Sequence, residues 1–318
     1  MRSPPSGSWA SASICESQRR PCGCWRRSRG PLADRTARGE PRGSRRPGGE
    51  SDAATTCLWE VSVRLSCAGY TFNTYFREKG LTLDRYIDIC SEMGLDGVEL
   101  TQYYFPETGA AYLNQLKRQL FRRGLELAGT AIGGAFCLPT PAERERHVEF
   151  VKEWLDISAR LGSPCLRVFA GETPKGHDER EAFDWTVSGI RECAVHAEQV
   201  GVMIGVENHG GLTGTADGLI RILEGVGSDW VGALLDFGNY HTDPYREFEQ
   251  TAPYTIMTHA KPTADFAGTR DWVDYRKVSE IMTKAGYRGF LSIEYEEPGK
   301  DAMVEVPRFA AYLRGIVG

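Results

Sequence analysis

The sequence of 318 residues lacks several features that would assign it to a common class of protein. It contains no run of about 18 apolar residues, so nothing in it predicts a membrane-spanning helix. Its nine cysteines are odd in number and follow no C-x-x-C spacing, which excludes a disulfide framework and predicts free thiols in a reducing, cytoplasmic compartment. No G-x-G-x-x-G follows the first apolar segment, which argues against a dinucleotide-binding sheet.

Acidic residues outnumber basic residues outside the N-terminal segment. Residues 1–58 contain 11 arginines against 5 acidic residues, although the whole chain has a net charge of −5. The remainder is therefore strongly acidic, and a nucleic-acid-binding domain would instead present a broad basic face. We expect a small-molecule substrate, without nucleic acid or membrane as a partner.

The first 58 residues differ in composition from the rest of the chain. They are rich in Arg, Pro, Gly and Ser and show no apolar periodicity, so we predict a disordered extension. The pairs Arg19-Arg20 and Arg26-Arg27 precede no apolar segment and do not predict export. We interpret this segment as a basic tail or an upstream extension, and residues 59–318 as the folded domain.

From Val63 onward, short apolar runs alternate with amphipathic segments such as 83–93, 143–161 and 185–200, most of which end at glycine. Eight βα units over about 255 residues are typical of a single-domain (β/α)8 TIM barrel. An open doubly wound sheet is the alternative. We interpret Gly210-Gly211 as a tight turn rather than a phosphate-binding loop. The predicted strands are 63–69, 96–101, 126–133, 165–171, 202–208, 231–238, 255–260 and 290–295.

Polar donors follow four successive strand candidates in the C-terminal half. Glu207, Asp236, His259 and Glu294 each come directly after apolar residues. The carboxyl ends of the strands of a TIM barrel meet at one mouth, so these side chains are expected to lie close together. Three carboxylates beside one imidazole favour Mn²⁺, Mg²⁺, Co²⁺ or Zn²⁺, of which we expect Mn²⁺.

Other polar residues of the same strands are candidates for substrate binding. Glu99 ends the second strand candidate, and Arg167 lies within the fourth, where a buried guanidinium needs an anionic partner. A structural carboxylate or the substrate could be that partner. His209 and His241 follow the fifth and sixth strands, and either could donate a hydrogen bond to a substrate hydroxyl group. Holding a metal ligand in place is the alternative role for His209.

The region from about 63 to 318 resembles the sugar phosphate isomerase/epimerase group of the xylose-isomerase-like TIM barrels. The resemblance is carried by the four donors and by Gly97-Val98-Glu99-Leu100, Arg167-Val168-Phe169-Ala170-Gly171 and Glu207-Asn208-His209-Gly210-Gly211. It implies that all four donors bind the metal. It also implies that Glu207 and Glu294 exchange the substrate proton through an enediolate.

Two positions depart from the pattern of the ketose 3-epimerases of this group. Asn239 stands three residues after Asp236, where many of these enzymes carry a histidine. Lys261 and then Arg270 are the nearest cations after His259, where a substrate-anchoring arginine often follows. We therefore expect Asn239 and Lys261 to contact the substrate, and sugar recognition to differ from that of the well-known ketose epimerases.

The leading hypothesis is a metal-dependent isomerase or epimerase that acts on a keto-sugar or related hydroxy-ketone. The main alternative is a lyase that cleaves C- or O-linked 3-oxo-glycosides, because proton removal beside a ketone can end in elimination. DNA repair of the endonuclease IV type fits less well, since those relatives hold three zinc ions with additional histidines. A non-catalytic sugar-binding protein is the last alternative. Relatives are often dimers or tetramers, so the resemblance allows a homo-oligomer.

Overall fold

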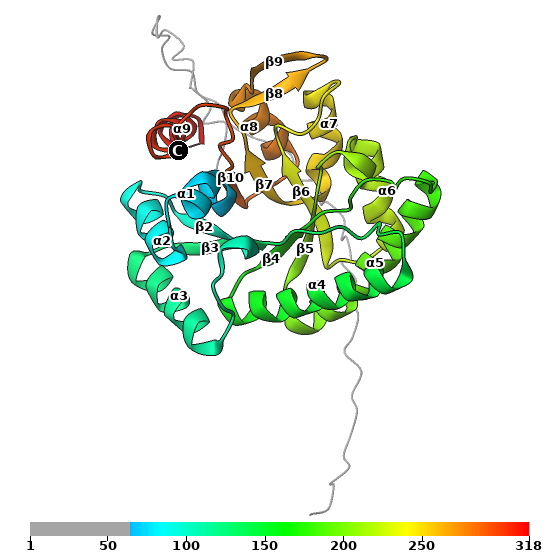
Figure 1. Cartoon of the computed structure of the whole chain (residues 1–318). Coiled ribbons are helices and arrows are strands. Elements are labelled where there is room, and N and C mark those ends of the chain that lie inside the picture. The colour runs from blue at the N-terminus through cyan, green and yellow to red at the C-terminus, as the bar shows by residue number, and fades with distance from the viewer. Residues whose placement is uncertain (1–63, 318) are drawn as a thin grey trace, which may run out of the picture. The chain divides into compact units, whose positions relative to one another are not determined.

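The computed structural model describes residues 64–317. Eight parallel strands form a closed barrel in the order β1-β10-β7-β6-β5-β4-β3-β2 (Figure 1). Each strand lies within one of the eight predicted ranges, so the predicted (β/α)8 barrel is confirmed. The strands are β1 (Arg64–Ala68), β2 (Gly97–Thr101), β3 (Glu126–Ala131), β4 (Cys165–Val168), β5 (Met203–Glu207), β6 (Val231–Asp236), β7 (Thr255–Ala260) and β10 (Phe290–Ile293).

Helices surround the barrel and connect successive strands (Figure 1). Apart from α1, which has no buried residue, they bury one face and expose the other, as an amphipathic pattern predicts. The helices are α1 (Asn73–Glu78), α2 (Leu83–Glu92), α3 (Ala110–Arg123), α4 (Pro141–Leu161), α5 (Glu179–Val200), α6 (Ala216–Val226), α7 (Pro244–Thr251), α8 (Tyr275–Lys284) and α9 (Ala302–Val317). Short 3-10 turns are η1 (Gly69–Phe72), η2 (Gln102–Tyr104), η3 (Gly211–Thr213) and η4 (Ala252–Tyr254).

Helix α5 begins earlier than its apolar pattern predicts, at Glu179 rather than at Trp185. The reason is a capping box. The side chain of Asp178 accepts a hydrogen bond from the backbone N–H of Glu181, and the side chain of Glu181 accepts one from the backbone N–H of Asp178. These two bonds satisfy backbone donors that a first helical turn leaves unpaired, so polar residues extend the helix beyond its buried face.

The barrel closes where β1 pairs with β10, with Ser66 beside Ser292. Cys165, Leu234 and Met257 pack together in a separate cluster of buried apolar side chains. A Cβ at Gly129 on β3 would lie 2.7 Å from the sulfur of Met257, so the small residue there makes room for the large one. The polar mouth of the barrel therefore rests on a filled interior, as is usual for this fold.

A hairpin between β7 and α8 was not predicted from the sequence. Its strands, β8 (Thr263–Phe266) and β9 (Thr269–Trp272), pair in antiparallel register. Every residue of β9 is exposed, so the segment lacks the apolar alternation by which a half-buried strand is recognised. Phe266 packs against Tyr245 of α7, with ring centroids 5.4 Å apart. This contact holds the hairpin beside the barrel.

The predicted disordered extension, residues 1–58, lies outside the described residues, and so do residues 59–63 of the predicted folded domain. Between residues 64 and 317, no helix combines the length and the apolar character that crossing a bilayer requires. The cysteines of this region, at positions 67, 90, 137, 165 and 193, are buried free thiols, which agrees with the prediction of free thiols.

The turn after β5 brings two backbone segments unusually close together. Gly211 has a φ of 49°, and a Cβ at this position would lie 2.4 Å from the carbonyl oxygen of Gly171. The backbone N–H of Leu212 donates a 3.0 Å hydrogen bond to the same oxygen. The close approach and the left-handed backbone both explain a glycine at position 211.

We predict that Gly211→Ala destabilises the protein more than Gly201→Ala does. Gly201 also has a positive φ, of 73°, but a Cβ there meets nothing within 4 Å. Alanine at position 201 is therefore disfavoured only by the left-handed backbone, which lowers the free energy of unfolding by about 1 kcal/mol. Gly211→Ala adds a clash with a backbone oxygen, and we expect about 2–3 kcal/mol in total. Urea unfolding curves measure both variants, and equal midpoints would contradict the close approach.

Candidate functional site

The carboxyl ends of β5, β6, β7 and β10 form one arc of the barrel mouth, and each supplies one residue of the predicted metal site. Glu207, Asp236, His259 and Glu294 each offer one ligand atom, and these atoms all lie within 4.8 Å of one another. All four side chains are buried, with exposed fractions of 0–5%. Asp236 and His259 are register partners on adjacent strands. The structure thus brings together the four residues that the sequence singled out.

His259 is oriented by Glu99, which lies on β2. The Nε2 atom of His259 lies 2.9 Å from a carboxylate oxygen of Glu99, so a proton on Nε2 is directed to Glu99 and the lone pair of the neutral imidazole is on Nδ1. Nδ1 lies 3.3 Å from Glu294, 3.7 Å from Asp236 and 4.0 Å from Glu207. Glu99 therefore fixes the imidazole with its free nitrogen toward the carboxylates. The contact of Glu99 with substrate stays a prediction.

Arg167 is paired with Glu207. Its Nε atom lies 3.2 Å from Glu207 Oε2, and both side chains are buried. The guanidinium also donates a 2.9 Å hydrogen bond to the carbonyl of Ile132 and lies 4.0 Å from the ring centroid of Phe169. The anionic partner that a buried arginine requires is thus a carboxylate of the protein itself.

Lys261 lies on the opposite side of the cluster. Its ammonium group lies 3.2 Å from Asp236 Oδ2 and 3.4 Å from Glu294 Oε2. It lies 2.6 Å from Glu296, a residue that the sequence did not single out for a role. Glu296 follows Glu294 by two positions, and that spacing could have indicated a second carboxylate at the same strand end.

Asn239 connects the two sides of the cluster. Its amide nitrogen donates a 3.2 Å hydrogen bond to Glu207 Oε1, and its amide oxygen accepts one of 3.2 Å from Lys261. At the position where many ketose epimerases carry an imidazole, this protein therefore has an amide that bridges a carboxylate and an ammonium group. Its contact with substrate stays a prediction.

Asn208 is a structural residue of the site that the sequence did not reveal. Its amide nitrogen donates to the backbone carbonyl of Asp236, and its amide oxygen accepts from the backbone N–H of Asp236, at 2.9 and 2.7 Å. This two-point contact fixes the end of β6 against the end of β5. The position of Asn208 directly after Glu207 was the available signal in the sequence. Its bonding partner, the backbone of Asp236, could not be read from the sequence.

The two remaining histidine candidates lie at the edge of the site. His209 is exposed and stacks at a tilt on Phe169, with ring centroids 4.3 Å apart. Loss of hydration around its ring, followed by the charges of Lys261 and Arg167, lowers the pKa of His209. His241 is exposed. Its backbone carbonyl accepts a 2.9 Å hydrogen bond from the backbone N–H of Ala267. The roles of both in substrate binding stay predictions.

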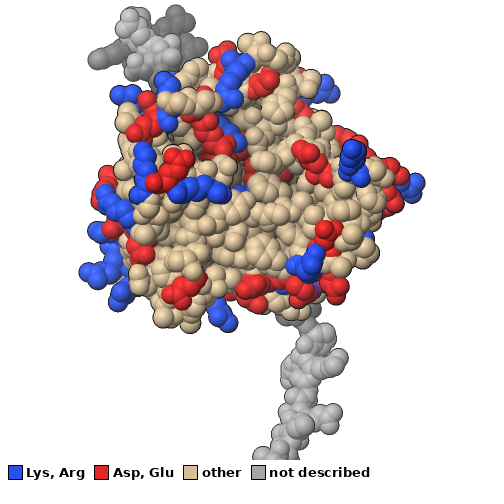
Figure 2. Space-filling model, viewed as in Figure 1, with Lys and Arg blue, Asp and Glu red and all other residues tan. Residues whose placement is uncertain are grey.

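Charge is distributed unevenly over the molecule. Figure 2 shows acidic side chains recessed in a hollow of one face, whereas the acidic and basic side chains around it are interspersed. Acidic groups that are recessed lose much of their hydration, so they require nearby positive charge.

Burial and crowded charges shift the pKa values within the cluster. Burial raises the pKa of Glu207 to about 8, although neighbouring positive charges oppose the shift. Burial also acts against ionisation of Glu294, but the charges of His259 and Lys261 outweigh it and hold the pKa of Glu294 well below its usual value. For His259, burial would lower the pKa, yet the attraction of Glu294 and Glu99 raises it well above the usual value.

The cluster has the properties of a binding site for a divalent cation. Within the described part of the chain, Glu207 Oε2, Asp236 Oδ2 and His259 Nδ1 are buried atoms without a hydrogen bond, although the two oxygens have ion-pair contacts with Arg167 and Lys261. Ligands on opposite sides of one small dication lie about 4 Å apart, so a spread of 4.8 Å needs only slight contraction. A dication would also offset the repulsion between the carboxylates.

Comparison with solved structures finds the same fold at low sequence identity. D-psicose 3-epimerase from Clostridium cellulolyticum H10, solved with D-tagatose, is 17% identical with a TM-score of 0.68, covering 80% of this chain and 99% of its own. The 3-keto-D-glucoside 4-epimerase YcjR from E. coli is 14% identical with a TM-score of 0.66, covering 80% of this chain and 99% of its own.

A third similar structure, a xylose isomerase-like TIM barrel protein from Mycobacterium smegmatis in complex with magnesium, is 18% identical. Its TM-score is 0.62, and the match covers 80% of this chain and 96% of that one. No curated protein sequence matches the chain. The family described as xylose isomerase-like TIM barrel matches residues 87–313, which is most of the chain and spans all four donors. The protein therefore belongs to the xylose isomerase-like TIM barrel family.

Proposed function

We propose that the protein is a divalent-metal-dependent isomerase or epimerase that acts on a keto-sugar or related hydroxy-ketone. The observation that carries the proposal is the pair of buried glutamates, Glu207 and Glu294, on β5 and just after β10, at the two ends of the donor arc. Family membership supports it, as does the likeness to two structures of sugar epimerases. The partner is then a small carbohydrate.

The metal would be held by Glu207, Asp236, His259 and Glu294, and we propose Mn²⁺. The donor set of three carboxylates and one imidazole suits this ion, and Mg²⁺ has similar requirements. When bound, such a dication polarises the carbonyl and hydroxyl oxygens of a substrate and makes the neighbouring C–H proton more acidic. Asp236 has no separate acid or base role in this proposal, since Lys261 and the backbone N–H of Gly238 hold its carboxylate.

Glu207 and Glu294 would transfer the proton. One carboxylate removes the proton beside the carbonyl to give the enediolate of the substrate, and the other returns a proton from the opposite face. Arg167 and Asn239 fix the position of Glu207, and Lys261 fixes that of Glu294, so each carboxylate has its own support. A placed carboxylate typically contributes about 10²–10⁴-fold to the rate as acid or base.

A nuclease activity of the three-zinc type is less well supported. Asn239 occupies the position where an additional imidazole would help, and it is engaged with Glu207 and Lys261. The described residues contain one group of potential metal ligands of this kind, namely the four-residue cluster. A single dication with two flanking carboxylates suits proton transfer, because each carboxylate can reach the substrate from its own side.

We predict that Asp236→Asn weakens Mn²⁺ binding by more than about 100-fold, because it removes a charged ligand at the centre of the arc. The amide keeps the shape of the side chain and can still accept the 2.7 Å hydrogen bond from Gly238. Asp156→Asn, at a surface ion pair with His196, is the matched control and should bind Mn²⁺ as the wild type does. Titration calorimetry and elemental analysis measure both. Unchanged affinity of Asp236→Asn would contradict the assigned site.

We also predict that Mn²⁺ affinity rises with pH and that binding releases protons. In the metal-free protein the pKa of Glu207 is raised to about 8 and that of His259 lies well above its usual value, so both hold protons at lower pH. A ligand must lose its proton to bind a metal. The affinity should therefore increase by up to about tenfold per pH unit for each displaced proton, below the pKa of that group. Calorimetry in buffers of different ionisation enthalpy counts the protons, and binding without proton release would oppose this prediction.

The reaction itself is tested by deuterium incorporation in deuterated water. With Mn²⁺ supplied, a panel of ketohexoses and 3-oxo-glucosides should include compounds that gain deuterium at the carbon beside the carbonyl. Glu207→Gln and Glu294→Gln should each slow exchange by about 10²–10⁴-fold. Glu247→Gln is the control, since Glu247 accepts a hydrogen bond from Ala216, at the start of α6.

Metal content is measured for every variant, so that loss of metal is not mistaken for loss of a base. If Glu207→Gln or Glu294→Gln exchanged deuterium at the wild-type rate, that glutamate would have no part in the mechanism. Absence of exchange with every compound of the panel would contradict the proposed function. Release of an aglycone from the 3-oxo-glucosides would identify elimination, and hence the lyase alternative.

A further inference from the structure

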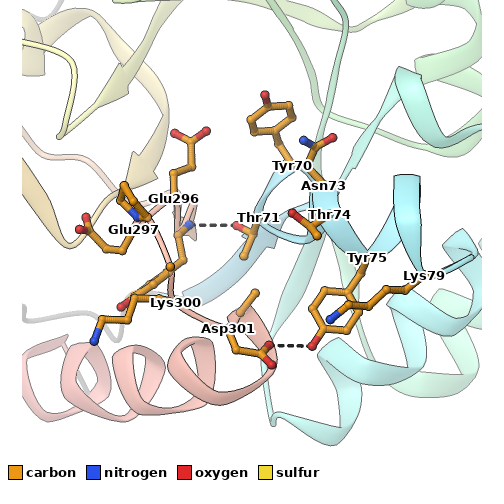
Figure 3. Close-up of a pocket in the computed structure, with 14 residues that line it drawn as sticks. Tyr70, Thr71, Asn73, Thr74, Tyr75, Lys79, Glu296, Glu297, Lys300 and Asp301 are labelled. Atoms are coloured by element: carbon orange, nitrogen blue, oxygen red, sulfur yellow. Dashed lines mark hydrogen bonds between the residues drawn. The ribbon is translucent and has the colours of Figure 1, made fainter.

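A cavity of about 450 Å³ lies next to the metal site, between two loops of the barrel mouth. One wall is formed by η1 and α1, and the other by the segment from Tyr295 to Ala302, which connects β10 to α9 (Figure 3). The volume is in the range of about 300–1,000 Å³ that is usual for small-molecule sites.

Glu296 belongs to both the cavity and the metal site. It lines the cavity, and its carboxylate lies 2.6 Å from Lys261, whose ammonium group lies 3.4 Å from Glu294. Figure 3 shows Glu296 and Tyr70 extending to the same side, away from α9. A molecule that reacts between the two catalytic glutamates therefore has the cavity as its neighbour, with Glu296 at the boundary.

The walls of the cavity are held together by hydrogen bonds. The hydroxyl of Thr71 donates to the carbonyl of Ile293 at 3.1 Å and accepts from the backbone N–H of Tyr295 at 3.0 Å. The hydroxyl of Tyr75 donates to Asp301 at 2.7 Å (Figure 3). These bonds join α1 and η1 to the loop before α9, so the cavity exists before a ligand arrives and little ordering is needed to fill it.

The charges of the lining argue against an anionic ligand. Three carboxylates, those of Glu296, Glu297 and Asp301, face two ammonium groups, those of Lys79 and Lys300. Lys79 already lies 3.9 Å from the ring centroid of Tyr75. Glu296 is paired with Lys261 and Glu297 with Arg270, so the charges of the lining are close to balanced. A phosphate or carboxylate would therefore meet no concentration of unpaired positive charge.

The uncharged groups of the lining suit a polyhydroxylated ring. Tyr70 offers a flat apolar surface with a hydroxyl tip, and Asn73 and Thr74 add an amide and a hydroxyl. The amide oxygen of Asn73 accepts hydrogen bonds from Tyr104 and Arg77. The NH₂ group of Asn73 is therefore the part of the amide that can donate to a ligand. Alternating apolar faces and hydroxyl groups are what a sugar ring presents.

We propose that this cavity is a subsite for a second, uncharged sugar ring, so that the substrate is a glycoside rather than a free monosaccharide. The inference rests on the proposed function, because the reacting ring occupies the metal site. It adds the class of substrate and assigns recognition of the aglycone to the residues of α1 and of the loop before α9.

Two probes with the same reacting ring test the subsite. One is methyl 3-oxo-β-D-glucoside, and the other is cellobiose oxidised to the ketone at C3 of its non-reducing ring. Deuterium exchange by the Mn²⁺-loaded protein should show a kcat/KM at least about tenfold higher for the disaccharide, the equivalent of one or two net hydrogen bonds. Thr74→Trp introduces an indole from an exposed position of the cavity wall and should remove this preference.

The methyl compound should react with Thr74→Trp within about twofold of the wild-type rate, since its reacting ring is unaffected. Val195→Trp, at an exposed position of α5 outside the cavity, is the control and should leave both rates unchanged. Equal kcat/KM values for the two probes, or a preference that Thr74→Trp does not alter, would overturn the subsite and leave the proposed function standing. Exchange in free ketohexoses but in neither glucoside would also overturn the subsite and leave the proposed function standing. Exchange in no compound at all would end the proposed function, and the subsite with it.

Discussion

Three carboxylates and one imidazole lie buried within 4.8 Å of one another at the barrel mouth, and the other polar residues around them respond to that concentration of charge. Carboxylates at such separations repel, and burial removes the water that would otherwise screen them. Arg167 supplies positive charge beside Glu207, and Lys261 supplies it beside Asp236 and Glu294. In the proposed function, a dication held by the four donors would offset the remaining repulsion between the carboxylates.

The barrel brings these groups together through elements that are distant in sequence. Glu99 on β2 fixes the imidazole of His259 on β7, although β1 and β10 lie between the two strands in the barrel. Asn208 fixes the backbone of Asp236 on the neighbouring strand. Rigid strands and these hydrogen bonds hold the side chains of the cluster in place, so that binding of a dication there would need little reorganisation.

The two glutamates differ in their surroundings, and that difference suits a reaction in which one accepts a proton and the other donates one. Glu207 is held by a guanidinium and an amide, whereas Glu294 is held by an ammonium group that also pairs with Glu296. Glu296 in turn connects the metal site to the neighbouring cavity. In the two proposals, Glu296 would therefore lie between the residues that transfer the proton and those that recognise the rest of the substrate.

The eight strands, the barrel and the four donors were predictable from the sequence. Short apolar runs between amphipathic segments, and polar residues at the ends of those runs, are local signals. The hairpin of β8 and β9 was not predictable, since β8 is short and β9 is fully exposed and carries no such pattern. Only the closed barrel decided that Glu99 turns to His259, that Arg167 pairs with Glu207, and that Asn239 bridges Glu207 and Lys261. A sequence determines which side chains reach the mouth of the barrel, but partners across it depend on distances that closure of the sheet sets.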